Sequence, residues 1–201
     1  MTGKPIPLLA VVALLAACSQ QTPPAAPAPA IVSPIQPTAG VQDIMKFMID
    51  PAADFLWESV STSVTEKGVD EKQPRTDEEW SEVRKHAIIL TESANLLLVE
   101  NRHVAREGQS LEDHGTPGNL TATESEEAIR NDRASFVAFA RALHDVGASM
   151  LKASDDRNPQ AIVDAGDTMD QVCEGCHLKF WYPGQKIPAF PGQAPETDSA
   201  R

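Results

Sequence analysis

The sequence is poor in cysteine and in basic residues. Each shortage limits the structures and functions that this protein can have. Three cysteines occur in 201 residues, and a chain of this length can build a hydrophobic core without disulfide bonds. Lysine and arginine total 17 against 29 aspartates and glutamates, which gives a formal net charge of −12. A surface of that sign repels nucleic acid, so nucleic acid is excluded as a partner.

Long apolar runs are also scarce, and the longest lies near the N-terminus. Residues 6–16 read IPLLAVVALLA and follow a single charge at Lys4. The run is too short to span a bilayer comfortably but has the proportions of a signal peptide. An ordinary signal cut nearby and an uncleaved anchor are both compatible with it.

The end of this run, Leu15 to Cys18, resembles a bacterial lipoprotein signal. The resemblance implies that residues 1–17 are removed, that Cys18 is lipidated, and that the protein is held to a membrane outside the cytoplasm, in the periplasm. Ser19 follows the cysteine in place of aspartate, which favours the outer membrane in enteric bacteria.

Proline dominates the segment that follows Cys18. Six prolines fall between Pro23 and Pro37, so the segment cannot be helical and has little to bury. Residues 18–40 are therefore expected to form a semi-extended tether that lifts a folded domain off the membrane. Residues 183–201 are again rich in proline and glycine and are expected to form a C-terminal tail.

Residues 41–182 contain no convincing strand and show four helical stretches. The first covers about residues 41–64, where Pro51 either kinks the helix or separates two short ones. The second begins after Thr76, which forms a capping box with Glu79, and runs to about residue 104. The third begins near Thr123, and the fourth begins at Asn158 and stops before residue 183. This pattern predicts an all-α fold, an antiparallel four-helix bundle.

The fourth helix carries the chemical motif, Cys173-Glu174-Gly175-Cys176-His177. A redox dithiol belongs at the start of a helix that follows a strand, where the helix dipole lowers the thiol pKa. A structural zinc site needs four ligands, and the other histidines are scattered over two helices and a loop. Both alternatives leave part of the motif unexplained.

C-x-x-C-H is the attachment signature of c-type haem. Each thiol adds to one haem vinyl group, and the adjacent imidazole binds the iron. On a helix the positions i, i+3 and i+4 lie on one face, so the two thiols and the imidazole can reach the same group. An export signal fits, because c-type haem is attached outside the cytoplasm in bacteria. We therefore expect one covalent haem on Cys173, Cys176 and His177.

With these features the chain resembles the class II cytochromes c, which include the cytochromes c′ and their low-spin c-556-type relatives. These are four-helix bundles with CxxCH near the end of the last helix. The resemblance covers roughly residues 41–182. It also implies that the protein can pair with a second copy through its first two helices.

The resemblance further implies a residue on the first helix that faces the open side of the haem, with a methionine commonly three positions later. Here Met45 takes the haem-facing position and Met48 the supporting one. Methionine binds the iron in the low-spin relatives, so Met45 is expected to be the second axial ligand. Methionines on an amphipathic helix are also common as core filler. His86 and His144 are the reserve ligands if Met45 does not bind.

These expectations favour electron transfer, with no catalytic residue set and hence no enzyme. The protein would carry single electrons between redox partner proteins through a His177/Met45 haem. The alternative is a five-coordinate haem that binds nitric oxide or another small gas, if Met45 faces elsewhere. A haem-free lipoprotein scaffold would require CxxCH to be an accident.

Overall fold

The computed structural model describes residues 35–185, and these residues are mainly helical, as the sequence predicts. The proposed signal peptide, Cys18 and the tether as far as residue 34 lie outside the described residues, as do residues 186–201. Among residues 35–185, none of the helices combines the length and apolar character that crossing a bilayer requires.

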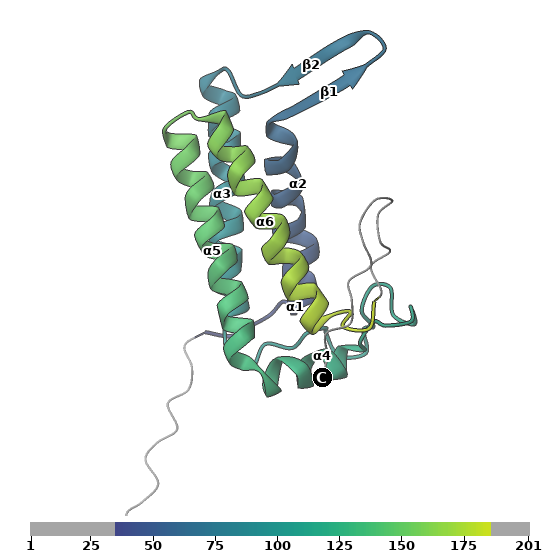
Figure 1. The fold of residues 1–201 in the computed structure, drawn as a ribbon. Coiled ribbons are helices and arrows are strands. Elements are labelled where there is room, and N and C mark those ends of the chain that lie inside the picture. The colour runs from purple at the N-terminus through teal and green to yellow at the C-terminus, as the bar shows by residue number, and fades with distance from the viewer. Residues whose placement is uncertain (1–34, 186–201) are drawn as a thin grey trace, which may run out of the picture. The chain divides into compact units, whose positions relative to one another are not determined.

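Long helices and one hairpin make up this part of the chain (Figure 1). The elements in chain order are α1 (Val41–Ile44), the π-helix η1 (Met45–Ile49), α2 (Asp50–Ser59), β1 (Ser61–Thr65), β2 (Gly68–Lys72), α3 (Asp77–Leu97), α4 (Ala122–Asn131), α5 (Arg133–Asp155) and α6 (Pro159–Phe180). Helix α3 packs on α5, α5 packs on α6, and α2 contacts both α3 and α6. The core between them is mainly aliphatic, with Leu56, Leu90, Met150 and Met169 fully buried, and also holds Trp80, Phe136 and Phe180.

Pro51 shapes the first helical segment without breaking it. A proline in an α-helix lacks an N–H, and its ring meets the carbonyl group four residues earlier. Here that carbonyl belongs to Phe47, which lies within η1. The wider π turn lets the N–H of Asp50 bond to the carbonyl of Met45, and α2 then begins with Pro51 in its first turn. The segment is thus one continuous helix with a π-helical turn in front of Pro51.

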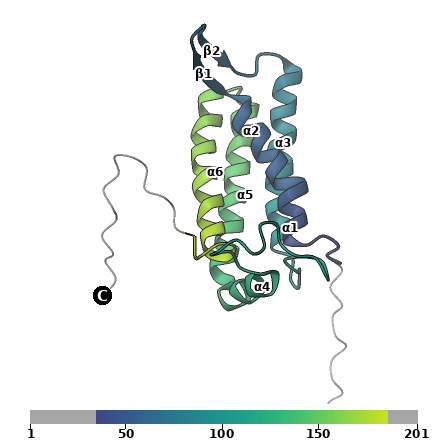
Figure 2. The same cartoon turned by 90° about the vertical axis from the view of Figure 1, so that its right-hand side faces the viewer.

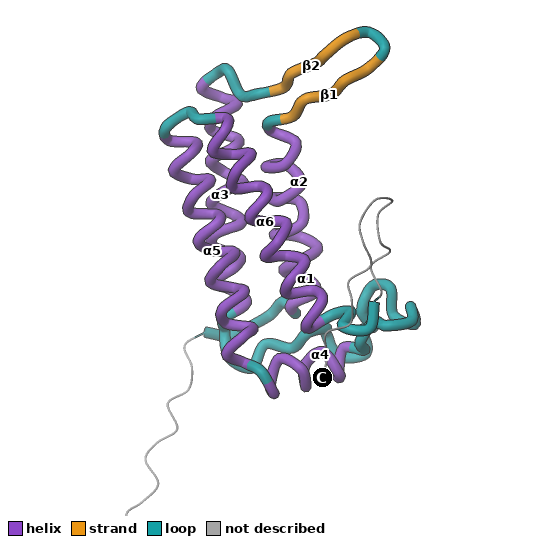
Figure 3. The backbone as a smooth tube through the Cα atoms, viewed as in Figure 1, coloured by secondary structure: helices purple, strands orange, loops and turns teal. Residues whose placement is uncertain are grey.

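The prediction that residues 41–182 contain no strand is wrong at residues 61–72. The first helix ends at Ser59, not near Val64, and an antiparallel hairpin follows with Thr65 opposite Gly68. Serine and threonine compete with helical hydrogen bonds, and β-branched side chains favour strands. Gly68 adopts φ 126°, which the tight turn requires. All ten strand residues are exposed, and Figure 3 shows the hairpin projecting from the helices.

Two further helix boundaries differ from the prediction. Helix α3 ends at Leu97, so the predicted end near residue 104 is wrong, and residues 98–121 form a long connection instead. The predicted third helix is divided at Asp132, whose backbone leaves helical geometry (φ −132°, ψ 59°). The Asp132 side chain accepts a hydrogen bond from the backbone N–H of Ser135, so it caps a new helix.

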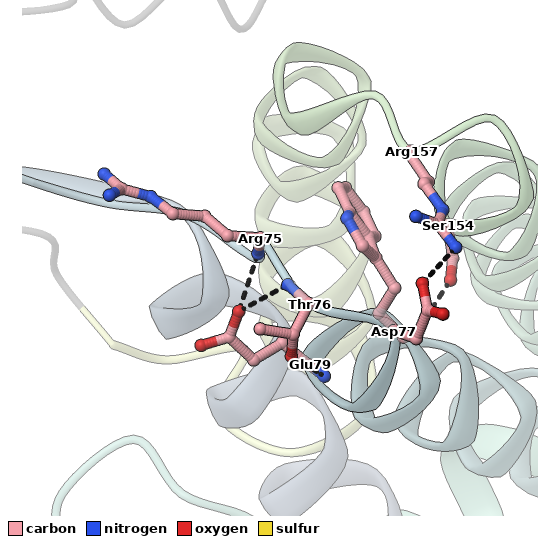
Figure 4. Close-up of polar contacts among 7 residues, drawn as sticks. Arg75, Thr76, Asp77, Glu79, Ser154 and Arg157 are labelled. Atoms are coloured by element: carbon pink, nitrogen blue, oxygen red, sulfur yellow. Dashed lines mark hydrogen bonds and ion pairs between the residues drawn. The ribbon is translucent and has the colours of Figure 1, made fainter.

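The helix starts predicted from capping residues are confirmed. Thr76 and Glu79 form reciprocal hydrogen bonds at the start of α3, and Figure 4 shows the one in which the Glu79 carboxylate accepts the N–H of Thr76. The same figure shows Asp77 pairing with Arg157, which joins the start of α3 to the turn between α5 and α6. At the start of α6, Asn158 Oδ1 accepts the N–H of Ala161 at 3.2 Å.

The long connection closes one end of the helices (Figure 2). Gln42 of α1 accepts the N–H of Glu112 at 2.7 Å and donates to the carbonyl of Ser110 at 3.3 Å. The N–H of Leu120 donates to the carbonyl of Trp181 at 2.7 Å. The connection is therefore fixed both to α1 and to the end of α6.

Helices α3 and α5 approach closely at Gly147. A Cβ atom at this position would lie 2.3 Å from Thr91 Oγ1 and 3.0 Å from the Thr91 backbone nitrogen. We expect Gly147→Val to lower the free energy of unfolding by about 2–3 kcal/mol, because the backbone of Thr91 cannot rotate away. Denaturant unfolding followed by circular dichroism measures the change. Ala148→Val on the exposed face of α5 is the matched control, and an equal loss in both variants would contradict the packing argument.

Candidate functional site

The last turns of α6 hold the cysteine–histidine motif at one end of the helices. Cys173, Cys176 and His177 are each half-buried, and both cysteines contact the hydrophobic core. Their positions i, i+3 and i+4 place them on one face of α6, as predicted. Gly175, between the cysteines, lies against α5, where a Cβ atom would come within 2.9 Å of the Phe139 ring.

A cavity of about 360 Å³ lies beside this face. The four predicted site residues, Met45, Cys173, Cys176 and His177, all line it. A smaller hollow of about 40 Å³ is also lined by Met45, Cys176 and His177. Cys173, Cys176 and His177 are close together in the sequence, but Met45 lies more than 120 positions before them. The fold therefore brings Met45 to the same cavity as the motif.

Met45 reaches the cavity from the first residue of the π-helix η1. Its side chain is half-buried and packs against the core. Met48 is also half-buried but lines neither of the two hollows that Met45 lines. Of the two methionines, Met45 is therefore the one whose side chain lines the cavity.

The thiols are protonated at neutral pH. Burial raises the pKa of Cys173 to about 11, with a smaller contribution from Asp170, Asp50 and Glu174. Burial also raises the pKa of Cys176 to about 12, with a smaller contribution from Cys173. A dithiol that exchanges disulfides needs a depressed thiol pKa, so this environment is the opposite of the one that redox chemistry requires.

The imidazole of His177 is half-buried and forms no hydrogen bond with a described residue. Burial lowers its pKa, and the nearby carboxylates of Glu174 and Asp50 oppose this only in part. Neither ring nitrogen has a hydrogen-bond partner among residues 35–185, while Trp181 and Tyr182 pack against the ring at centroid distances of 5.3 and 5.7 Å. A neutral imidazole with a free nitrogen is the form that binds a metal.

Acidic side chains surround the cavity. Its lining includes the carboxylates of Asp50, Glu112, Asp113, Asp170 and Glu174, and one cation, Lys46, which pairs with Glu112 across the rim. Tyr182 donates a hydrogen bond to Glu174 at 2.8 Å, and burial together with this bond raises the tyrosine pKa. Four of the lining carboxylates, those of Asp50, Glu112, Asp113 and Asp170, belong to exposed residues, so the cavity opens to solvent at its rim.

The structure does not bring the two reserve histidines to the cavity. His86 stacks on Phe55 with centroids 3.8 Å apart and bonds to the carbonyl of Glu82. His144 lies beside the exposed carboxylate of Asp145. Neither lines the cavity, so the structure gives no support to either histidine as a reserve ligand.

Several lining residues were not predicted from the sequence. Trp57 lines the cavity from α2, and its indole N–H donates to the carbonyl of Gly166 on α6 at 3.2 Å. Glu112, Asp113 and Asn119 come from the long connection after α3. Tyr182 also lines the cavity, and its position five residues after His177 was a sequence signal that could have identified it. No comparable signal in the sequence identifies the residues of the long connection.

The described part of the chain offers little support for a metal ion held by protein side chains alone. No group of three or more histidine, cysteine, aspartate or glutamate side chains is arranged there to hold an ion. Cys173 and Cys176 therefore lack, within residues 35–185, the additional protein ligands of a structural zinc site.

No protein-family model matches the chain, no curated protein matches it, and no solved structure matches it.

Proposed function

We propose that this protein is a c-type cytochrome that carries single electrons. The observation that carries the proposal is the shared cavity: both thiols of C-x-x-C-H, its histidine and Met45 line one space although they come from α6 and η1. The local motif alone would explain three of these residues, but it does not explain why a thioether lies in the same cavity.

The chemistry of the lining residues fits a covalent haem. Two protonated, half-buried thiols at i and i+3 supply the groups that form thioether bonds. The imidazole of His177, whose pKa is lowered by burial and which has no hydrogen bond to a described residue, would supply one ligand to the iron. Met45 supplies a thioether as the other. The surrounding carbon atoms of Leu97, Ala140 and Leu143 supply an apolar wall.

The fold in this proposal is an antiparallel four-helix bundle of the class II cytochrome c type. The segment α1–η1–α2 would be its first helix, followed by α3, α5 and α6. The contacts of α3 with α5, α5 with α6, and α2 with both α3 and α6 support this arrangement. The hairpin at residues 61–72 and the short α4 would be additions to it.

The haem would supply the one-electron Fe(III)/Fe(II) couple. The protein's contribution is to hold its ligands and control the surroundings. A methionine ligand favours Fe(II) and raises the potential relative to two histidines. Because His177 and Met45 would both stay bound, no substrate needs to enter and no catalytic residues are needed. The carboxylates at the rim would favour the more positively charged Fe(III) state and so lower the potential.

The location in this proposal is the periplasm, with Cys18 as the lipidated residue. Residues 18–40 would form the tether to the membrane, with the outer membrane favoured. A tether confines the domain near redox partner proteins and raises their local concentration.

The optical spectrum tests the electron-transfer assignment. The protein is produced with a cytochrome c maturation system, and the spectrum is recorded oxidised and then reduced. We expect a low-spin spectrum with sharp reduced bands, because two strong ligands fill both axial positions. A high-spin spectrum with broad bands would contradict ligation by Met45 and favour binding of nitric oxide or a similar small gas. Absence of haem would contradict the whole proposal.

A further inference from the structure

A second cleft, of about 450 Å³, lies between the connection after α3, helix α4 and the start of α5. Its apolar floor includes Val41, Leu97, Ile129 and Phe136. Its charged lining consists of Arg102, Arg130, Arg133, His103, Glu100 and Glu126. None of these charged residues lines the cavity beside Cys173, Cys176 and His177, so the cleft and that cavity differ in both position and charge.

The three arginines line one cleft and, like Arg75 and Arg141 elsewhere in the described chain, form no ion pair with a described carboxylate. Acids outnumber basic residues 29 to 17 in this chain, and Arg84, Arg106 and Arg157 all form ion pairs. Within residues 35–185, no carboxylate forms an ion pair with any of the three arginines of the cleft. Their positive charge is therefore not neutralised by the described part of the chain.

Backbone carbonyl groups hold two of these arginines in place. Arg102 donates from Nε to the carbonyl of Leu96 at 2.9 Å and from Nη1 to the carbonyl of Ala39. Arg133 donates from Nη2 to the carbonyl of Leu98 at 3.0 Å, and its guanidinium lies 5.2 Å from the Phe136 ring centroid. Both side chains are half-buried and keep further N–H groups unused among the described residues.

The third arginine, Arg130, is exposed and makes no hydrogen bond or ion pair with a described residue. The acids of the cleft do not compensate for it. Glu126 accepts the N–H of Val104 at 2.9 Å and pairs with His103 at 3.2 Å, and Glu100 is exposed. Three arginines against two glutamates leave the cleft with an excess positive charge, although the chain carries −12.

We propose that this cleft binds an oxyanion of the phosphate type. Guanidinium groups form paired, charge-assisted hydrogen bonds with phosphate oxygens. A tetrahedral dianion presents enough oxygen atoms to engage three arginines at once, whereas one carboxylate presents two. Arg102 and Arg133 are already fixed by the backbone, so binding would mainly restrict Arg130. The site does not depend on haem.

Isothermal titration of the full chain with inorganic phosphate tests the proposal, with ionic strength held constant by sodium chloride. We expect saturable binding of one phosphate per chain. Arg130→Gln should weaken it at least about tenfold, the size of one charge-assisted hydrogen bond. Arg141→Gln is the matched control, because Arg141 is exposed on α5, forms no ion pair with a described carboxylate and lies outside the cleft. It should leave the affinity unchanged.

Arg133→Lys adds a test of geometry, since it keeps the charge but removes the fork of donors. We expect it to weaken phosphate binding while circular dichroism shows a folded protein. No saturable binding, or equal weakening by Arg130→Gln and Arg141→Gln, would overturn the proposal.

A lipid headgroup and a free ion share the phosphate chemistry, and a second arm distinguishes them. The full chain carrying Cys18→Ser, which cannot be lipidated at that residue, is sedimented with vesicles of phosphatidylglycerol or of phosphatidylcholine. Arg130-dependent binding to phosphatidylglycerol vesicles assigns the site to a lipid phosphate. Binding of inorganic phosphate without vesicle binding assigns it to a free ion.

Discussion

Met45→Ala is expected to convert a low-spin haem spectrum into a high-spin one. Alanine has no atom that can reach or bind iron, so under the proposed assignment the iron would lose one ligand and would keep His177. The reduced protein should then bind carbon monoxide readily, which the parent protein should resist. Optical and electron paramagnetic resonance spectra of the oxidised and reduced protein measure the change. The midpoint potential should fall, because the thioether no longer stabilises Fe(II).

Met48→Ala is the matched control for this experiment. It removes the same side chain three residues further along η1, where Met48 is half-buried but does not line the cavity. We expect it to remain low-spin. An unchanged spectrum in Met45→Ala would remove Met45 from the iron, and a high-spin spectrum in both variants would point to general disturbance of η1.

The helices were predictable because their signals are local. Thr76 and Glu79 accept unpaired N–H groups at the start of α3. At the start of α6, Asn158 accepts one and Pro159 has no N–H to satisfy. These signals lie within four consecutive residues, which suffice to identify a helix start. The hairpin at residues 61–72 was missed because its side chains are all exposed, and an exposed hairpin has no buried face to produce a clear alternation.

The π-helical turn that begins at Met45 could not be predicted from the sequence, for a different reason. Pro51 predicts a disturbance of the helix, but a kink, a break and a widened turn all relieve its contact with the Phe47 carbonyl. The choice among them depends on packing of the first helical segment against α3, α6 and the long connection. That packing also decides which methionine faces the cavity, so the spacing of Met45 and Met48 alone could not settle their orientations.

In the candidate site, too, the residues positioned by local helix geometry were predictable and those positioned by contacts between distant segments were not. Cys173, Cys176 and His177 lie within five consecutive positions on one helix, so their common face follows from helical geometry. Glu112 and Asn119 line the same cavity only because Gln42 and Trp181 fix the connection after α3 across the end of the helices. Such contacts between distant segments leave no periodic pattern, and they supply much of the charge around the cavity.

The largest expected effect is the loss of covalent haem when Cys173 and Cys176 are both replaced by serine. In the proposed attachment, each S–H would add across a vinyl C=C bond: the sulfur would form a C–S bond and the proton would go to the other vinyl carbon, so no oxidant would be consumed. A serine hydroxyl is a far weaker nucleophile and does not make this addition under the same conditions. After maturation, the parent protein should keep its haem through denaturing electrophoresis and acid–acetone extraction, and the double variant should lose it. Mass spectrometry of the denatured chain gives an independent measurement.

Cys18→Ser is the matched control, because it removes the remaining cysteine of the chain. It should retain covalent haem and lose membrane attachment, which separates the two roles assigned to cysteine in this protein. Haem that survives denaturation in the Cys173→Ser/Cys176→Ser variant would contradict attachment at α6. Each single variant should keep the haem through one bond, because His177 and the other thiol still hold the same face of the helix. That intermediate result would distinguish two equivalent thioether sites from a single essential thiol.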